Sequence, residues 1–164
     1  MTAIVGMSLE QKTDVVQRHS VAATRRLKGE HILYGEAYVI QTGKQCELSY
    51  WVSEGMQKHG VATTLVQTLC RYVFGKKKLH AHRIDAFVSP ANPFAAASIR
   101  VLEKNGFTED QSYSERSRRV RGEGYQCFSL LKEHWAKNEP VGSPLVSYSA
   151  APATSVPPES GTKL

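Results

Sequence analysis

Hydrophobic and β-branched residues are concentrated in two neighbouring segments of the chain, residues 31–41 and residues 45–53. Such residues favour strands because they pack well on a pleated surface. Between the two segments stands Thr42-Gly43-Lys44, a short run whose glycine suits a tight turn. Two strand-like segments joined by a short turn that contains glycine predict a β-hairpin.

Helical spacing of the apolar residues begins after the second of these segments. One side of the predicted helix carries Val61, Leu65, Leu69 and Val73. The pattern predicts a helix over residues 59–74 that ends at Gly75, because glycine commonly ends helices. Residues 83–88 form the next predicted strand. Since the helix has the right length for a crossover connection, we expect this strand to lie parallel to the strand at 45–53.

A second helix and a second hairpin are predicted further along the chain. The helix covers residues 94–104, and Gly106 is placed to cap its C-terminal end. Residues 112–120 and 125–131 are predicted to pair as a hairpin around residues 121–124. The predicted order of elements after the N-terminal region is therefore β-β-α-β-α-β-β.

The two ends of the chain carry weaker patterns. Residues 1–12 show no convincing periodicity. From Thr13, a loose helical spacing predicts a helix that ends near Arg25-Arg26, where positive charges are favoured. The segment after Trp135 is rich in proline, serine and alanine and is predicted to be disordered. We therefore expect a partial N-terminal helical region (1–29), one domain (30–135) and a disordered tail (136–164).

Composition and charge narrow the class of protein. A chain of 164 residues is long enough for one domain with a proper core and short for two. The formal net charge of +6 favours an anionic ligand, which could be nucleic acid, a phosphorylated cofactor or an acidic protein. No hydrophobic run reaches membrane-spanning length, and the N-terminus lacks the basic start of a signal peptide. Neither a membrane partner nor secretion is expected.

The cysteines and histidines do not predict a metal site. Cys46, Cys70 and Cys127 are odd in number and include no Cys-x-x-Cys pair, which argues against both a disulfide scaffold and zinc. His80 and His82 have no third ligand nearby in the sequence. We expect a reducing, cytoplasmic location and no bound metal.

The turn between the strand at 45–53 and the following helix is a candidate anion site. The first N–H groups of a helix lack internal partners and carry partial positive charge, so they can hold a phosphate ester. Gly60 and Ala62 are small enough to let a bulky anion reach the main chain. An ordinary tight turn between a strand and a helix is the alternative explanation of the same residues.

Four segments together resemble a known family. They are Ser49-Tyr50-Trp51-Val52, residues 57–63, Asn92 with residues 98–107, and residues 128–135. In this order they resemble the GCN5-related N-acetyltransferases (GNAT), and within them the RimJ/RimL type of ribosomal-protein N-acetyltransferase. The resemblance implies the α/β (α+β) GNAT fold. This fold has a mixed, mostly antiparallel sheet with a splayed parallel strand pair and helices on both faces, here with shortened N-terminal elements.

The same resemblance implies acetyl-CoA as the cofactor and assigns residues to it. The loop that holds its pyrophosphate on main-chain amides would be Gln57, Lys58, His59, Gly60, Val61 and Ala62. Peptide groups that pair with the pantetheine arm would come from Trp51, Val52 and Ser53. The arm would be flanked by Asn92 and Ser98. Because these two residues are spaced more widely than in the family, Ala95 is the alternative to Asn92.

Acetyl transfer also needs a base, because an amine must lose its proton before it attacks a thioester. Glu47 and Asp85 are the candidate bases, each with a salt-bridged carboxylate on a strand as the alternative. Tyr113 is the candidate acid that would protonate the departing thiolate. A half-buried tyrosine of the sheet is the alternative for that residue.

The resemblance favours N-acetylation of a primary amine, above all a protein N-terminus such as that of a ribosomal protein. A small-molecule amine (a polyamine or an antibiotic) and a CoA-binding module with impaired catalysis are the alternatives. The arginines of residues 116–121 lack the interleaved aromatic residues of an RNA-binding platform, which argues against a nucleic-acid partner. No pattern indicates an oligomeric state.

Overall fold

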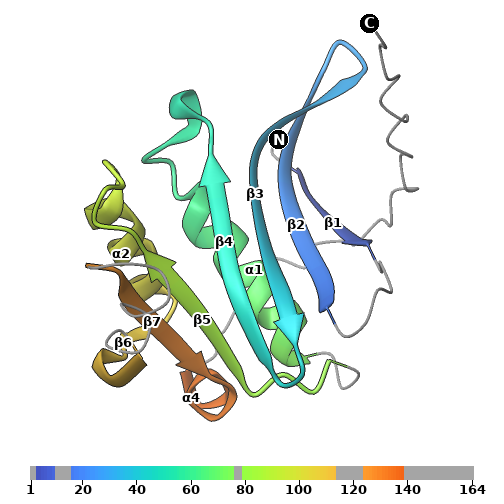
Figure 1. Cartoon of the computed structure of the whole chain (residues 1–164). Coiled ribbons are helices and arrows are strands. Elements are labelled where there is room, and N and C mark those ends of the chain that lie inside the picture. The colour runs from blue at the N-terminus through green and yellow to red at the C-terminus, as the bar shows by residue number, and fades with distance from the viewer. Residues whose placement is uncertain (1–2, 10–15, 76–78, 114–123, 139–164) are drawn as a thin grey trace, which may run out of the picture.

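One mixed sheet runs through the computed structural model of the chain, which describes residues 3–9, 16–75, 79–113 and 124–138. Its seven strands lie in the order β1-β2-β3-β4-β5-β7-β6 (Figure 1). The strands are β1 (Ala3–Leu9), β2 (Val16–Leu27), β3 (Glu30–Thr42), β4 (Gln45–Val52), β5 (Arg83–Val88), β6 (Thr108–Glu109) and β7 (Gln126–Leu131). The helices are a 3-10 turn (Glu54–Met56), α1 (Val61–Gly75), α2 (Ala95–Lys104) and α4 (Lys132–Asn138). Within the described residues β4 and β5 are the one parallel pair, which confirms the predicted mixed sheet.

The centre of the sheet follows the predicted order. β3 and β4 pair antiparallel along their length, and Gly43 takes φ +60° in the turn between them. α1 then contacts β2, β3 and β4 and returns the chain to β5. β5 runs parallel to β4, as a helical crossover allows. The predicted hairpin, helix and parallel strand are confirmed.

The N-terminal helix predicted from Thr13 is wrong. Residues Val16–Leu27 form the long strand β2, which pairs with β1 on one side and β3 on the other. Buried His19, Val21 and Ala23 alternate with more exposed neighbours, which is the periodicity of a strand. The helix prediction relied on a spacing of three or four residues and missed this period of two. The N-terminal region is therefore part of the same sheet and is not a separate helical unit.

The strand that pairs with β7 lies earlier in the chain than predicted. β6 (Thr108–Glu109) pairs with β7, whereas Gln111–Tyr113 are helical and residues 114–123 lie outside the described part of the chain. The chain returns to the sheet soon after α2 because of Gly106. This glycine takes φ +83° just past the end of the helix, as its predicted capping role requires. A left-handed glycine reverses the chain at once, so Thr108 enters the sheet. The predicted strand at 125–131 is confirmed as β7.

The C-terminal boundary of the domain also lies later than predicted. Ala136 was expected to begin the disordered tail, but α4 continues to Asn138. Residues 139–164, which hold the rest of that predicted tail, lie outside the described ranges. Among the helices that the structure describes, none combines the length and hydrophobicity that a membrane crossing requires.

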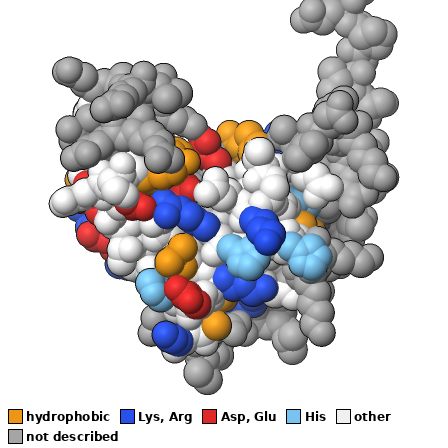
Figure 2. All heavy atoms as spheres, turned by 60° about the horizontal axis from the view of Figure 1, so that its bottom comes forward, with side chains coloured by type: hydrophobic (Ala, Val, Ile, Leu, Met, Phe, Trp, Pro, Cys, Tyr) orange, Lys and Arg blue, Asp and Glu red, His pale blue; other side chains and the backbone are white. Residues whose placement is uncertain are grey.

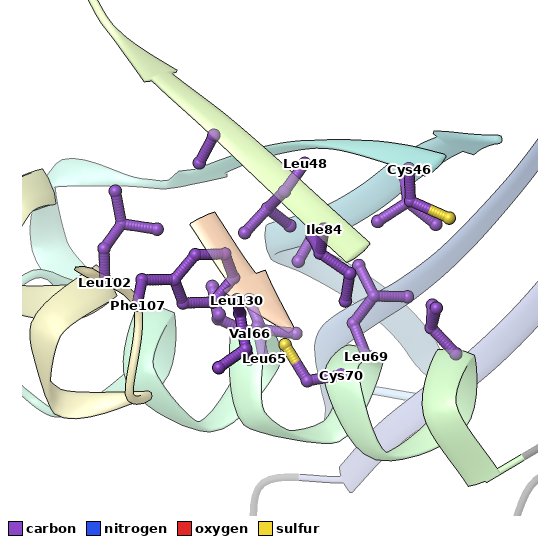
Figure 3. Packing of buried hydrophobic residues seen from close by; sticks show 14 of the residues in the cluster. Cys46, Leu48, Leu65, Val66, Leu69, Cys70, Ile84, Leu102, Phe107 and Leu130 are labelled. Atoms are coloured by element: carbon purple, nitrogen blue, oxygen red, sulfur yellow. The ribbon is translucent and has the colours of Figure 1, made fainter. Parts of the chain in front are cut away.

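The hydrophobic core lies between the sheet and α1 (Figure 3). Leu65 and Leu69 of α1 are fully buried, and Leu48 and Ile84 reach this core from β4 and β5. Burial of each such side chain is worth about 1.5–3 kcal/mol. Gly35 lets β3 approach α1 closely, because a Cβ at this position would lie 3.1 Å from Leu65 Cδ1. This packing fixes the positions of the central strands.

Helical residues also cover the opposite face of the sheet. Ala86 and Val88 point into the core, so the alternating side chain of Phe87 points to the other face. There the ring of Tyr113 lies 6.0 Å from the Phe87 ring, measured between centroids. Tyr113 ends the helical residues Gln111–Tyr113. Helices therefore cover both faces of the sheet, as expected.

Candidate functional site

The two parallel strands separate halfway along β4. Their pairing begins at Gln45↔Arg83 and ends at Leu48↔Ala86, although β4 continues to Val52 and β5 to Val88. A pocket of about 140 Å³ lies in the resulting fork. Its lining includes Ser49 and Tyr50 of β4, Phe87 and Val88 of β5, and Asn92 and Ser98. The splayed parallel pair expected from the sequence is confirmed.

The main chain of β4 divides its hydrogen-bonding groups between β3 and the fork. The Ser53 N–H donates to the Tyr34 carbonyl oxygen at 2.7 Å, and the Ser53 carbonyl oxygen accepts from the Met56 N–H at 2.9 Å. Because successive residues of a strand direct their peptide groups to opposite edges, Val52 and Tyr50 direct theirs toward the fork.

This register changes the predicted contacts with a pantetheine arm. Of the three residues predicted to supply free peptide groups, Val52 faces the fork. The N–H of Ser53 is not free, and the alternation directs the peptide groups of Trp51 toward β3. Tyr50 faces the fork and was missed as a site residue, because the edge that each residue serves depends on the register between β3 and β4. The apolar pattern of the strand does not specify that register.

The entrance to α1 lies just beyond the open end of the fork. The Thr64 N–H donates to the Gly60 carbonyl oxygen at 3.0 Å, which closes the first helical turn. The N–H groups of Val61, Ala62 and Thr63 precede this bond and have no acceptor within the helix. Gly60 takes φ +76°, and a Cβ there would meet no heavy atom within 4 Å. The helix entrance is therefore open to an anion at the position predicted from the sequence.

A basic, exposed loop leads into this entrance. Lys58 and His59 are exposed, and Lys58 takes the left-handed φ of 63° that few residues other than glycine adopt. His59 Nδ1 lies 2.7 Å from the Gln57 carbonyl oxygen, so Nδ1 carries the proton of that hydrogen bond. These contacts place the predicted loop residues beside the first turn of α1 and leave a lysine side chain in solvent there.

The helix α2 closes the fork on its core side. Tyr50 Oη donates to the Ser98 carbonyl oxygen at 3.0 Å, which ties β4 to α2 across the pocket. Burial raises the pKa of Tyr50 above its ordinary value. Asn92 Oδ1 accepts from the Phe94 N–H at 2.9 Å and fixes the turn before α2. Asn92 and Ser98 both line the pocket, whereas Ala95, the alternative to Asn92, does not.

Two carboxylates stand side by side at the closed end of the fork. Glu47 of β4 and Asp85 of β5 form the register pair that precedes the last one, on the sheet face opposite α1. Asp85 is 4% exposed and its Oδ1 accepts from Arg83 Nε at 2.6 Å. Burial raises the pKa of Asp85, and the hydrogen bond from Arg83 opposes that rise. Glu47 is half-buried.

Tyr113 lies on the same sheet face as these carboxylates. Its ring contacts Phe87, which lines the pocket, and the Arg83 guanidinium lies 5.0 Å from the ring centroid. The three residues predicted to carry the chemistry (Glu47, Asp85 and Tyr113) are thus brought to one face beside the fork. Phe87 was not among the predicted site residues, although its side chain lines the pocket.

Histidine and basic side chains gather on the end of the molecule that faces the viewer in Figure 2. At the end of the sheet away from the open fork, the His82 N–H donates to the Lys44 carbonyl oxygen, and His80 and His82 are both exposed. In the ranges that the structure describes, no three His, Cys, Asp or Glu side chains are grouped as metal ligands. The arginines predicted to form a basic cluster at 116–121 lie outside those ranges.

The sequence and the fold were compared with those of known proteins. Residues 9–108 match the family model described as the acetyltransferase (GNAT) domain. No curated protein sequence matches the chain. The fold is similar to the solved structure of spermidine N-acetyltransferase from Vibrio cholerae in complex with CoA and spermine, with a TM-score of 0.53 and 17% identity. The similarity covers 73% of this chain and 68% of that one.

Two further solved structures have the same fold. One is a chimera of the Vibrio cholerae spermidine N-acetyltransferase SpeG and hSSAT, with a TM-score of 0.55 and 18% identity over 74% of this chain and 70% of that chain. The other is a domain from Methanocaldococcus jannaschii, with a TM-score of 0.53 and 14% identity over 70% of this chain and 66% of that chain. At these identities the similarity concerns the fold.

Proposed function

The chain belongs to the GNAT acetyltransferase family, and on this premise we propose that it transfers the acetyl group of acetyl-CoA to the amine of a protein N-terminus. The family match covers residues 9–108, which hold the fork, the α1 entrance and both candidate bases. The chain is accordingly an N-acetyltransferase that uses acetyl-CoA. The N-terminal acceptor and the roles of individual residues are the parts that we propose.

One observation carries the proposal: the pairing of β4 with β5 stops at Leu48↔Ala86, while β4 leads on to an open helix entrance. The residues present there fit acetyl-CoA. Main-chain N–H groups at Val61 and Ala62 suit the pyrophosphate, and the peptide groups of Tyr50 and Val52 suit the pantetheine amides. When bound, acetyl-CoA would supply an acetyl thioester that is already activated for attack by an amine.

Glu47 is the residue that we propose as the general base. An amine near neutral pH is mostly protonated, so a carboxylate must take a proton from it, directly or through water. Asp85 already accepts a hydrogen bond from Arg83 Nε at 2.6 Å and is 4% exposed, which limits its access to an acceptor. Glu47 is half-buried at the same register position. Asp85 then serves to hold Arg83.

Tyr113 is the residue that we propose as the proton donor to the leaving thiolate. Its ring lies against Phe87 in the wall of the pocket, on the same sheet face as Glu47. A phenol keeps its proton near neutral pH, since its ordinary pKa is about 10. The base and the acid would therefore act from one face of the sheet.

Two features support a protein N-terminus as the acceptor. The four segments of the sequence resemble the RimJ/RimL type, whose acceptors are the N-termini of ribosomal proteins. In addition, a net charge of +6 repels a polycation at long range more strongly than a singly charged amine. A polyamine is the second candidate, because similar solved structures include a spermidine N-acetyltransferase in complex with CoA and spermine.

Thiol release from acetyl-CoA tests the proposal. The purified protein is incubated with peptides that carry a free N-terminus, with the same peptides blocked at the N-terminus, and with spermidine. Release with the free peptides alone, and a mass gain of one acetyl group on the first residue, would support the proposed acceptor. Release with spermidine alone would favour the polyamine. CoA binding in a calorimeter without release on any amine would indicate a module impaired in catalysis, and absence of CoA binding would overturn the assignment.

A further inference from the structure

We propose that Arg83 is a positioning residue for acetyl transfer, which holds Tyr113 against β5 beside the fork. This inference rests on the proposed role of Tyr113. It concerns a residue that neither the pattern of the sequence nor the family resemblance singles out. Its basis is a set of contacts that lead from β5 to the tyrosine.

Arg83 contacts two carboxylates and an aromatic ring on one face of β5. Its Nε donates to Asp85 Oδ1 at 2.6 Å, and its Nη2 donates to Asp110 Oδ2 at 2.8 Å. The guanidinium also lies 5.0 Å from the centroid of the Tyr113 ring. A planar guanidinium can bind two carboxylates in its plane and an aromatic ring against its face, which the ammonium of a lysine cannot reproduce. The arginine therefore joins β5 to the segment that carries the tyrosine.

Asp110 extends this connection to the main chain of Tyr113. Its Oδ1 accepts from the Tyr113 N–H at 3.1 Å and from Ser112 Oγ at 2.7 Å. The Asp110 N–H donates to the Cys127 carbonyl oxygen at 2.8 Å, which anchors the same residue to β7. The hydrogen bonds from Ser112 and Arg83 lower the pKa of Asp110 to about 2, so this carboxylate is charged throughout the neutral range. Loss of Arg83 would remove this charged link between β5 and Tyr113 and would leave only the ring contact with Phe87 on that strand.

The contacts of Arg83 place the Tyr113 ring on the sheet face that carries the proposed base. Tyr113 contacts Arg83 and Phe87, which lie on the same face of β5, with Asp85 between them. Phe87 lines the pocket, and Asp85 pairs in register with Glu47. A tyrosine held here lies against a residue of the pocket wall, on the sheet face that carries the proposed base. Displacement of the ring by about 1 Å is enough to lower the rate of a positioned reaction strongly.

A double-mutant cycle tests the inference. Thiol release is measured for the parent, Arg83→Gln, Tyr113→Phe and the double variant. We expect each single change to lower kcat by roughly 10- to 100-fold, with the KM for acetyl-CoA nearly unchanged. The double variant should be no slower than Tyr113→Phe, because an arginine that acts through the phenol has nothing left to position. Independent, multiplying losses would overturn the inference, as would an unchanged kcat in Arg83→Gln.

Arg18→Gln is the matched control. Arg18 also lies over a tyrosine, 4.2 Å from the Tyr38 ring centroid, and its Nη2 lies 3.1 Å from Glu36 Oε1. The control removes the same types of contact elsewhere in the sheet, and its kcat should stay at the parent value. Should Arg83→Gln fail to fold, as judged by circular dichroism, Arg83→Lys keeps the charge but loses the planar fork and should lose kcat similarly.

An NMR measurement separates this inference from the proposed function. Tyrosine rings are labelled with carbon-13, and the Tyr113 signal is identified by its loss in Tyr113→Phe. Arg83→Gln should move that signal toward the shift of a free tyrosine, whereas Arg18→Gln should leave it in place. An unmoved signal would overturn the inference whatever the activity. A parent enzyme that releases no thiol would overturn the proposed function and the catalytic part of the inference, while the ring signal would still report whether Arg83 holds Tyr113.

Discussion

Glu47 and Asp85 face each other across β4 and β5, one register pair before the two strands separate. Two carboxylates on neighbouring strands thus lie side by side in different surroundings. Asp85 is buried and bound to Arg83, whereas Glu47 is half-buried. Unequal surroundings favour unequal roles: burial raises the pKa of Asp85, but its burial and its hydrogen bond with Arg83 limit its access to an acceptor amine.

Glu47→Gln is therefore expected to lower kcat by about 10²- to 10⁴-fold, the usual contribution of a general base. CoA affinity in a calorimeter should stay the same, because Glu47 lies at the closed end of the fork and away from the α1 entrance. Asp85→Asn is the matched change on the neighbouring strand and should cost less turnover. If Glu47→Gln keeps the parent rate at every pH while Asp85→Asn does not, the two roles are reversed.

Gly60→Glu is expected to abolish CoA binding. The side chain would place negative charge beside the N–H groups that open α1, where a phosphate needs them. The left-handed φ of +76° adds about 1–2 kcal/mol of backbone strain for any residue other than glycine.

Gly43→Glu controls for that strain. Gly43 takes φ +60° in the β3–β4 turn, and a Cβ there meets no heavy atom within 4 Å, as at Gly60. Both variants should lose similar stability in urea, but Gly43→Glu should bind CoA like the parent. Normal CoA binding by Gly60→Glu would show that the loop has been misassigned.

Local patterns were sufficient to predict most of the central sheet and the α1 entrance. The spacing of Leu65, Leu69 and Val73 identifies a helix face that the structure buries. Gly60 and Gly106 take the left-handed conformation for which glycine is favoured. Glu47 and Asp85 could be predicted to lie near each other because their strands were predicted to be parallel neighbours, and the structure pairs them in register. These features depend on residues close together in sequence or on one crossover.

Features that depend on long-range pairing could not be predicted in the same way. β2 was read as a helix because its alternation of His19, Val21 and Ala23 becomes meaningful only beside β1 and β3. Likewise, the hydrogen bond from Ser53 to Tyr34 decides which peptide groups of β4 face the fork. Arg83 gave no signal either, since its partner Asp110 is far from it in sequence.

Asp110 should make stability depend on pH in the acid range. Hydrogen bonds from Ser112 and Arg83 lower its pKa in the folded state from 3.8 to about 2. A lowered carboxyl pKa stabilises the fold fully above pH 3.8, and this contribution is lost as the pH falls through 2. The difference in free energy of unfolding between the parent and Asp110→Asn should therefore shrink from neutral pH to pH 2. A difference that is constant over this range in urea titrations would contradict the predicted coupling.

The three cysteines should be unreactive in the folded protein. Cys46, Cys70 and Cys127 are buried and form no disulfide, and burial raises the pKa of Cys46 and Cys127 to about 12. The thiolate is the reactive form, so at pH 8 only about one thiol in ten thousand at either position is poised to react. A disulfide reagent should detect no protein thiol during an assay and three thiols after denaturation. Rapid labelling of the folded protein would mean that one of these cysteines is exposed by local opening.

The alternation along β4 decides which of its peptide groups face β3 and which face the fork, where acetyl-CoA is proposed to bind. The peptide groups of Tyr50 and Val52 both face the fork because the two residues are two positions apart in an extended strand. The direction of these peptide groups does not depend on the identity of the side chains. Conservative replacements of either side chain should therefore be tolerated by the cofactor. Insertion or deletion of a single residue within β4 would instead exchange the peptide groups that face the fork with those that face β3. The amides that face the ligand would then point toward β3.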